Sequence, residues 1–202
     1  MRILTAIGAL AVIGAIGAAV FFLGGFYNVA GTAKDPAIVE WVLVRARTAS
    51  IVRHANDVPP AGFDNPANVQ AGARKFAEQG CANCHGAPGV NWAKYSEGLV
   101  PDPPGLKDVV NERTPAQLFW VIKNGVNMTG MPSFALAGAK DDDIWAIVAF
   151  LKKLPSVAEA DYKAWTAPPP APAAAPAVPP AAAPVPAPNP PAPAAAPPAQ
   201  NQ

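Results

Sequence analysis

The sequence predicts an all-α protein, and three observations support this fold class. Apolar residues recur at helical spacing in several stretches, as they do at Val69, Gly72, Ala73 and Phe76. Residues typical of helix starts and helix ends flank these stretches, and no alternating strand pattern is evident in the sequence. The first residues of the chain are almost all apolar, which is typical of a helix that crosses a membrane.

Composition divides the chain into four parts. We expect a membrane anchor over residues 1–30, an amphipathic connector over 31–63, a helical domain over 64–165 and a tail over 166–202. The tail is almost all Pro and Ala and cannot bury a core, so we expect it to be extended and disordered. The formal net charge is +1 without a basic block in the domain, which gives no support to nucleic-acid binding.

The N-terminal segment predicts a single membrane-spanning helix. No charged residue lies between Ile3 and Val29, and a helix of that length would extend ~40 Å, enough to cross a hydrocarbon core of ~30 Å. The alternative is a cleaved secretory signal, for which residues 30–33 offer small side chains. We favour a retained anchor because the apolar run exceeds the ~7–15 residues of a signal. Small residues four apart, which let another helix approach, hint at a membrane partner: Ala11, Ala15 and Ala19.

The connector contains a second helix. Asp35-Pro36 is a helix-start signal, and the stretch after it carries apolar residues together with Arg45, Arg47 and Arg53. Such a basic amphipathic helix either lies along the membrane surface with Trp41 at the interface, or is a solvated connector. The sequence is compatible with both interpretations.

Three helices are expected in the domain, each bounded by start and stop signals: Asn65-Pro66 to Gly80, Thr114-Pro115 to Gly125, and Asp141 to Pro155. The run Asp141-Asp142-Asp143 is explained better as helix caps that complement the helix dipole than as a metal site. Residues 87–110 show no strong periodicity, and we expect a long irregular loop there that a bound group helps to fill.

Cys81-Ala82-Asn83-Cys84-His85 is the attachment pattern of a c-type haem, and it contains the only two cysteines of the chain. Two thiols three positions apart on a helical turn project to one side, where each can add to a vinyl group of a porphyrin. His85 then lies under the iron as its proximal ligand. A redox dithiol would need a strand-loop-helix context, and a zinc site would have to recruit His54 as its fourth ligand, so both are weaker alternatives.

A sixth iron ligand is expected in the loop at 126–134, which is rich in Gly and Pro. Met131 is the choice, because Gly130 permits a close backbone approach and Pro132 stiffens the loop. Met128 is the runner-up, and His54 is a weaker choice than either. Four further residues are candidates for lining the haem or binding its propionates, although Trp120 is better explained by helix packing: Trp92, Tyr95, Arg113 and Trp120.

Residues 64–165 resemble class I cytochromes c, especially the single-haem bacterial domains related to the haem subunit of cbb3-type oxidases. The matching residues are Gly72 and Phe76, the haem motif with Gly86, and the segments 129–134 and 143–151. The resemblance implies a small cytochrome c fold in which the first and last helices cross at Gly72, against which Phe150 packs. It also implies that a proline carbonyl accepts a hydrogen bond from the proximal histidine, a role for which Pro103 and Pro104 compete.

These features together predict a membrane-tethered, periplasmic electron carrier with one covalent haem c. The cofactor-binding residues are Cys81, Cys84, His85 and Met131, with His85 and Met131 as axial ligands, and no catalytic side chain is needed. The expected partners are a dehydrogenase or quinol-oxidising complex and a terminal oxidase of a respiratory chain, without a small-molecule substrate. Two alternatives are a redox subunit of a larger membrane oxidoreductase and a haem sensor or peroxidase with a labile sixth ligand.

Overall fold

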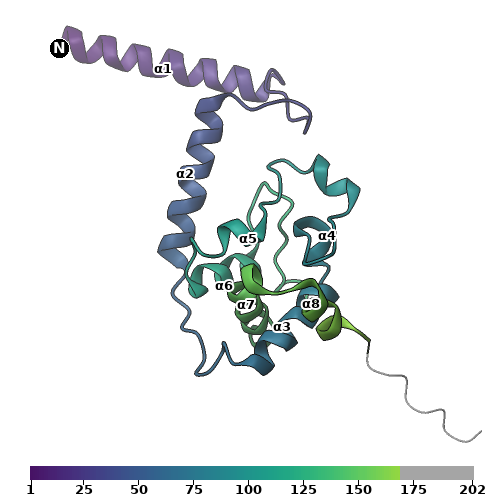
Figure 1. Ribbon diagram of the computed structural model, residues 1–202. Coiled ribbons are helices and arrows are strands. Elements are labelled where there is room, and N and C mark those ends of the chain that lie inside the picture. Colours follow the sequence, from purple (N-terminus) through teal and green to yellow (C-terminus); the bar gives the residue numbers. More distant parts are fainter. Residues whose placement is uncertain (169–202) are drawn as a thin grey trace, which may run out of the picture. The chain divides into compact units, whose positions relative to one another are not determined.

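The computed structural model describes residues 1–168, which form eight α-helices and two short 3-10 helices and include no strand (Figure 1). The prediction of an all-α fold is confirmed. Residues 169–202, which hold most of the expected tail, lie outside the described residues. The helices are α1 Arg2–Leu23, α2 Ala37–His54, α3 Pro66–Glu78, α4 Cys81–His85, η1 Lys94–Gly98, α5 Leu106–Val109, α6 Pro115–Asn124, α7 Asp141–Lys153, η2 Leu154–Ser156 and α8 Glu159–Thr166.

Helices α3 and α7 cross at the centre of the domain, and Gly72 is the point of closest approach. A β-carbon at Gly72 would lie 1.9 Å from the carbonyl oxygen of Ala146 and 2.9 Å from the β-carbon of Phe150. No side chain fits in that space, so only glycine allows the two backbones to approach so closely. The crossing that the cytochrome resemblance implied is therefore present.

Aromatic side chains fill the core on both sides of this crossing. The rings of Phe76 and Phe150 are completely buried, with centroids 5.3 Å apart, and Tyr162 of α8 stacks on Phe150 at 5.7 Å. Phe119 of α6 stacks on Trp145 of α7 at 4.1 Å. Offset aromatic pairs at such distances contribute about 0.5–1.5 kcal/mol beyond the burial of their area. These contacts join α3, α6, α7 and α8 into one core.

The expected helix starts are correct for α3 and α6. Asn65 caps α3 by accepting a hydrogen bond from the backbone N–H of Asn68 at 2.8 Å. Thr114 and Gln117 cap α6 reciprocally, which satisfies two backbone donors. The expectation for α7 was partly wrong, because Lys140 is its N-cap and no side chain caps it. The three aspartates occupy its first turn instead, where their charges still complement the helix dipole.

Three further elements were not expected: η1, α5 and α8. The segment 87–110 contains η1 and α5 rather than an irregular loop throughout. Lys152 of α7 fixes its end by donating hydrogen bonds to the carbonyl oxygens of Val110 at 2.8 Å and Arg113 at 3.3 Å. Helix α8 follows η2 and packs against α3 through buried Tyr162. Its eight residues are too few for a clear periodic pattern.

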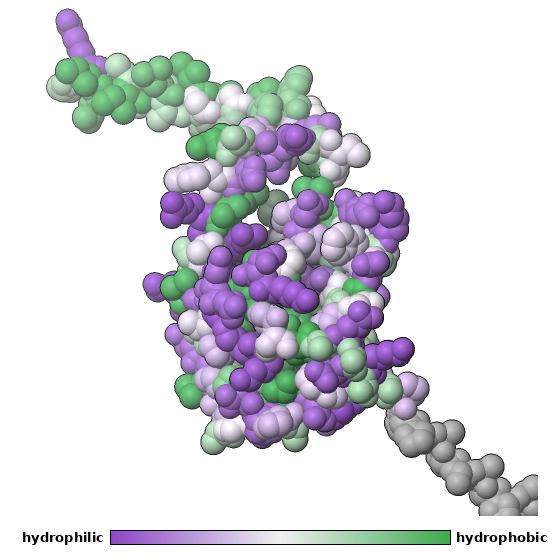
Figure 2. Space-filling model, in the orientation of Figure 1, coloured by the Kyte–Doolittle hydropathy of each residue, from purple (hydrophilic) through white to green (hydrophobic). Residues whose placement is uncertain are grey.

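The N-terminal helix α1 is shorter than the apolar run that predicts it. It ends at Leu23 because two glycines follow, and Gly25 has a φ of 77°. Its 22 residues extend ~33 Å, which still suffices to cross a bilayer core. None of its side chains is buried, and its surface is almost uniformly hydrophobic (Figure 2). The helix is therefore long and apolar enough to span a membrane.

Candidate haem-binding site

The haem motif forms its own short helix, α4, between two glycines in the left-handed region. Gly80 has a φ of 72° and Gly86 a φ of 67°, so the chain turns sharply before and after the motif. Both cysteines are half-buried free thiols that do not form a disulfide. Burial raises the pKa of the Cys81 thiol to about 12, so this group stays neutral at physiological pH. Two free thiols on one turn are the groups that thioether attachment requires.

His85 ends this helix and is held by a contact distant in the sequence. Its Nδ1 lies 3.0 Å from the carbonyl oxygen of Pro104. Because a carbonyl only accepts, Nδ1 carries the proton, and Nε2 keeps the lone pair that a metal needs. Burial lowers the pKa of His85, opposed by this hydrogen bond, so the imidazole is neutral at physiological pH. Of the two prolines that competed for this role, Pro104 is the one in contact.

The loop that carries Met131 is fastened to the end of α6. Gly125 caps α6 with a φ of 69°, and a β-carbon there would lie 2.6 Å from the backbone of Pro132 and 2.8 Å from the carbonyl oxygen of Met131. The backbone N–H of Val126 donates to that carbonyl at 3.1 Å, which closes the loop. Ser133 donates from its hydroxyl to the Lys123 carbonyl at 2.7 Å. The backbone of Met131 is thus held from both sides.

Thr129 stabilises the same loop through two hydrogen bonds of its side chain. Its hydroxyl donates to the carbonyl of Val126 at 2.8 Å and accepts from the backbone N–H of Met131 at 3.1 Å. One hydroxyl therefore ties both ends of the loop together. This role of Thr129 is not predicted by the sequence, since a threonine in a polar loop gives no signal of which backbone groups it will meet.

The two methionines of this loop differ sharply in environment. The side chain of Met131 is half-buried and packs against the aromatic core. That of Met128 is 81% exposed, and its backbone has a φ of 60°, which is unusual for a residue other than glycine. The environment of Met131 suits a fixed ligand, whereas Met128 lies at the exposed tip of the loop.

The other four candidates for haem contacts also differ in their surroundings. Tyr95 lies beside Cys84, and local loss of water, followed by the contact with this thiol, raises the pKa of the phenol. Trp92 approaches Gly86 and, with Cys84 and His85, lines a cavity of about 300 Å³. Trp120 stacks on His54 of α2 with ring centroids 6.1 Å apart, as helix packing predicts. Arg113 lies at the end of the segment held by Lys152.

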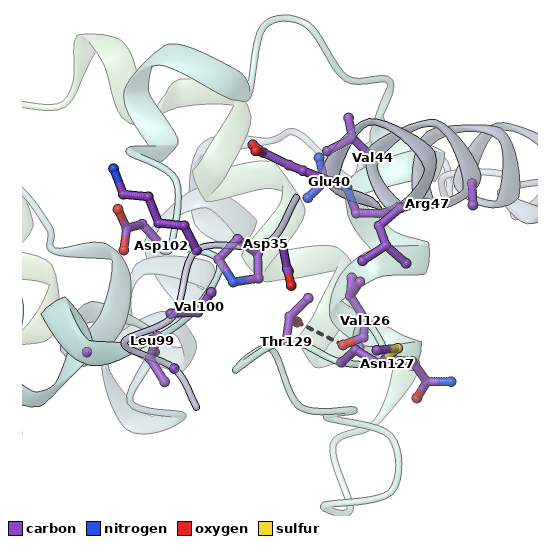
Figure 3. A pocket seen from close by; sticks show the side chains of 18 of the residues that line it. Asp35, Glu40, Val44, Arg47, Leu99, Val100, Asp102, Val126, Asn127 and Thr129 are labelled. Atoms are coloured by element: carbon purple, nitrogen blue, oxygen red, sulfur yellow. Dashed lines mark hydrogen bonds between the residues drawn. The ribbon is translucent and has the colours of Figure 1, made fainter. Parts of the chain in front are cut away.

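A second and larger cavity, of about 1420 Å³, flanks the loop that carries Met131 (Figure 3). It is lined by one face of α2 and by the segments 30–35, 97–102 and 124–129. Its wall includes Leu99 and Val126 but neither the haem motif nor Met131, so it lies beside the candidate site rather than at its centre. Leu99 also contacts the backbone of Gly130, where a β-carbon would lie 2.9 Å from the leucine methyl groups.

The weaker interpretations of the Cys-x-x-Cys pair lack their structural context. Residues 1–168 contain no strand to support a thioredoxin-like dithiol. Within the same residues no group of three or more His, Cys, Asp or Glu side chains is placed to hold a metal ion, and His54 stacks on Trp120 instead. The donors that are present fit a haem c: two free thiols, an imidazole with Nε2 unprotonated and a half-buried thioether.

Comparison with known proteins agrees with this geometry. Residues 67–151 match the family described as cytochrome C oxidase, cbb3-type, subunit III. No curated protein and no solved structure matches the chain. The matched segment begins in α3 and ends in α7, so it contains the Gly72 crossing, the haem motif, Pro104 and Met131. Such a domain implies haem c and electron transfer. The chain therefore carries, over residues 67–151, a class I c-type cytochrome domain of the cbb3-type oxidase subunit III family.

Proposed function

We propose that the protein is a membrane-tethered electron carrier with a single haem c. Cys81 and Cys84 would hold the haem through thioether bonds, and Nε2 of His85 and the sulfur of Met131 would bind its iron. The occurrence of a single Cys-x-x-Cys-His motif in the sequence supports one haem per chain. Bound haem iron supplies a centre that gains or loses one electron.

The observation that carries this proposal is that the chain itself fixes the backbone or ring of both axial donors. The Pro104 carbonyl fixes the ring of His85, and the bonds to Val126 and Thr129 fix the backbone of Met131. Two fixed protein donors leave no position for a substrate or a gas. A site of this kind favours outer-sphere transfer of single electrons over catalysis, so no catalytic residue is assigned.

The identity of the sixth ligand strongly affects the reduction potential of the carrier. A thioether is a soft neutral donor that favours ferrous iron, and Met/His ligation raises the reduction potential. A raised potential suits a carrier that accepts electrons from a dehydrogenase or quinol-oxidising complex and delivers them to a terminal oxidase. These protein partners are proposed from the ligand chemistry and the family.

We place the domain in the periplasm, tethered by α1 to the bacterial inner membrane. α1 is long enough to span the bilayer, and Arg2 precedes it, in agreement with an N-terminus in the cytoplasm. Haem c is attached on the outer face of that membrane, which requires the domain to be there. The proposal includes a retained anchor rather than a cleaved signal.

Spectroscopy and mass spectrometry together test the proposed function as a membrane-tethered carrier. We expect an intact mass of the chain from Met1 plus one haem, a low-spin spectrum with a Met-to-iron band, and slow reaction of the ferric protein with cyanide. A high-spin ferric haem that binds cyanide or CO rapidly would contradict the carrier and favour the sensor or peroxidase alternative. A mature N-terminus after residue 30 would contradict the anchor alone.

A second candidate function is that of a redox subunit in a larger membrane oxidoreductase. The family to which residues 67–151 belong is described as an oxidase subunit, and the small residues of α1 permit close approach of another helix. Purification in a mild detergent distinguishes the two functions. A catalytic partner in a one-to-one ratio favours the subunit, and an active monomer that reduces an added oxidase favours the free carrier.

A further inference from the structure

Helix α2 has two faces, and only one of them packs against other parts of the protein that the structure describes, residues 1–168. The inner face carries buried Ile51, and His54 near its end stacks on Trp120 of α6. Residues of the same face, including Val44 and Arg47, line the cavity beside the loop that carries Met131 (Figure 3). The C-terminal end of α2 is therefore attached to the cytochrome domain.

The outer face of α2 carries an apolar stripe without a partner among residues 1–168. The stripe follows the spacing of one helix face and consists of Ile38, Trp41, Val42, Arg45, Ala49 and Val52. None of its members lines the cavity, and its four large apolar side chains are between 48% and 66% exposed. Its one charged member, Arg45, lies with its guanidinium 5.8 Å from the centre of the Trp41 ring.

We propose that this stripe binds the surface of the phospholipid bilayer in which α1 is anchored, so that α2 holds the cytochrome domain against the membrane. The inference rests on the proposed anchoring by α1. Residues 24–36 are the only chain between the end of α1 and the start of α2, so α2 begins close to the bilayer.

The composition of the stripe supports a bilayer surface rather than a protein partner. Trp has an apolar ring with a polar N–H and concentrates at the membrane interface. Arg45 has an apolar stem that can lie along the stripe while its charge reaches the phosphates. Positive charges are in excess from residue 34 to the end of α2 at residue 54, with Lys34, Arg45, Arg47 and Arg53 against Asp35 and Glu40, which favours anionic lipids.

Tryptophan fluorescence of the full holoprotein tests the proposal, because α1 contains no tryptophan. The protein is reconstituted in vesicles of phosphatidylcholine and phosphatidylglycerol with bromine on the acyl chains, either near the headgroup or near the chain end. We expect bromine near the headgroup to quench part of the emission. That part should disappear in Trp41→Phe and persist in the control Trp165→Phe.

Equal quenching of wild type and Trp41→Phe by bromine near the headgroup would overturn the proposal. The stripe would then either be free or bind a second copy or another protein. Stronger quenching by bromine near the chain end would overturn it too, because a surface helix does not reach that depth. Alkaline carbonate extraction of the same vesicles separates the two levels of inference. If the protein resists extraction but shows no quenching specific to Trp41, only the proposed role of α2 is contradicted. If the protein is extracted, both the anchor and this inference are contradicted.

Discussion

The α3–α7 crossing and the Met131 loop are both organised by a glycine, but different interactions hold them. At the crossing, Gly72 lets two helices meet and buried aromatic rings fill the remaining space. In the loop, Gly125 lets two stretches of backbone meet, and hydrogen bonds from Val126, Thr129 and Ser133 fix them. The crossing should therefore control folding, while the loop should control the iron ligand with a smaller effect on stability.

Replacing Gly72 by Ala should have the largest effect. The new β-carbon would lie 1.9 Å from a backbone oxygen, and neither helix can move without breaking the core. We expect a loss of more than about 3 kcal/mol in the free energy of unfolding, measured by denaturant titration. Gly98→Ala is the matched control, since its β-carbon would meet no atom within 4 Å. Similar stability of the two variants would contradict the close crossing.

Gly125→Ala should affect the loop more than the fold. The substitution adds left-handed strain of about 1–2 kcal/mol and pushes the β-carbon into the backbone around Met131. We expect the Met-to-iron band to weaken and the reduction potential to fall. Gly138→Ala is a close control, because Gly138 has a φ of 93° but open space around it. That variant should lose stability and keep the band, and loss of the band in both would show that strain alone explains the effect.

Thr129→Val should produce a smaller change confined to the ligand. It removes the hydroxyl that joins Val126 to Met131, and a hydrogen bond of this kind contributes about 0.5–1.5 kcal/mol. We expect imidazole to displace the methionine from ferric iron up to about tenfold more readily, measured by absorbance titration. Thr129→Ser keeps the hydroxyl and should behave like the wild type. Equal displacement in all three proteins would mean that the hydroxyl does not position the loop.

The difference between the two regions also explains what the sequence could predict. Helix starts such as Asn65-Pro66 and Thr114-Pro115 depend on a few adjacent residues, and the crossing at Gly72 followed from the family pattern. The haem motif is local too. The bonds of Thr129 and the Lys152 contact with Val110 depend on where the folded backbone passes, which no local pattern encodes. For the same reason α8 was not predicted. It is too short to show a clear periodic pattern in the sequence and is stabilised by packing against α3.

The central claim is that Met131, rather than Met128, completes the iron site opposite His85. The most direct measurement compares the absorption spectra and reduction potentials of Met131→Ala and Met128→Ala holoproteins. Met131 is half-buried against the core and Met128 is 81% exposed, so the account predicts loss of the Met-to-iron band and a lower potential in Met131→Ala alone. An unchanged spectrum in Met131→Ala, together with loss of the band in Met128→Ala, would contradict it.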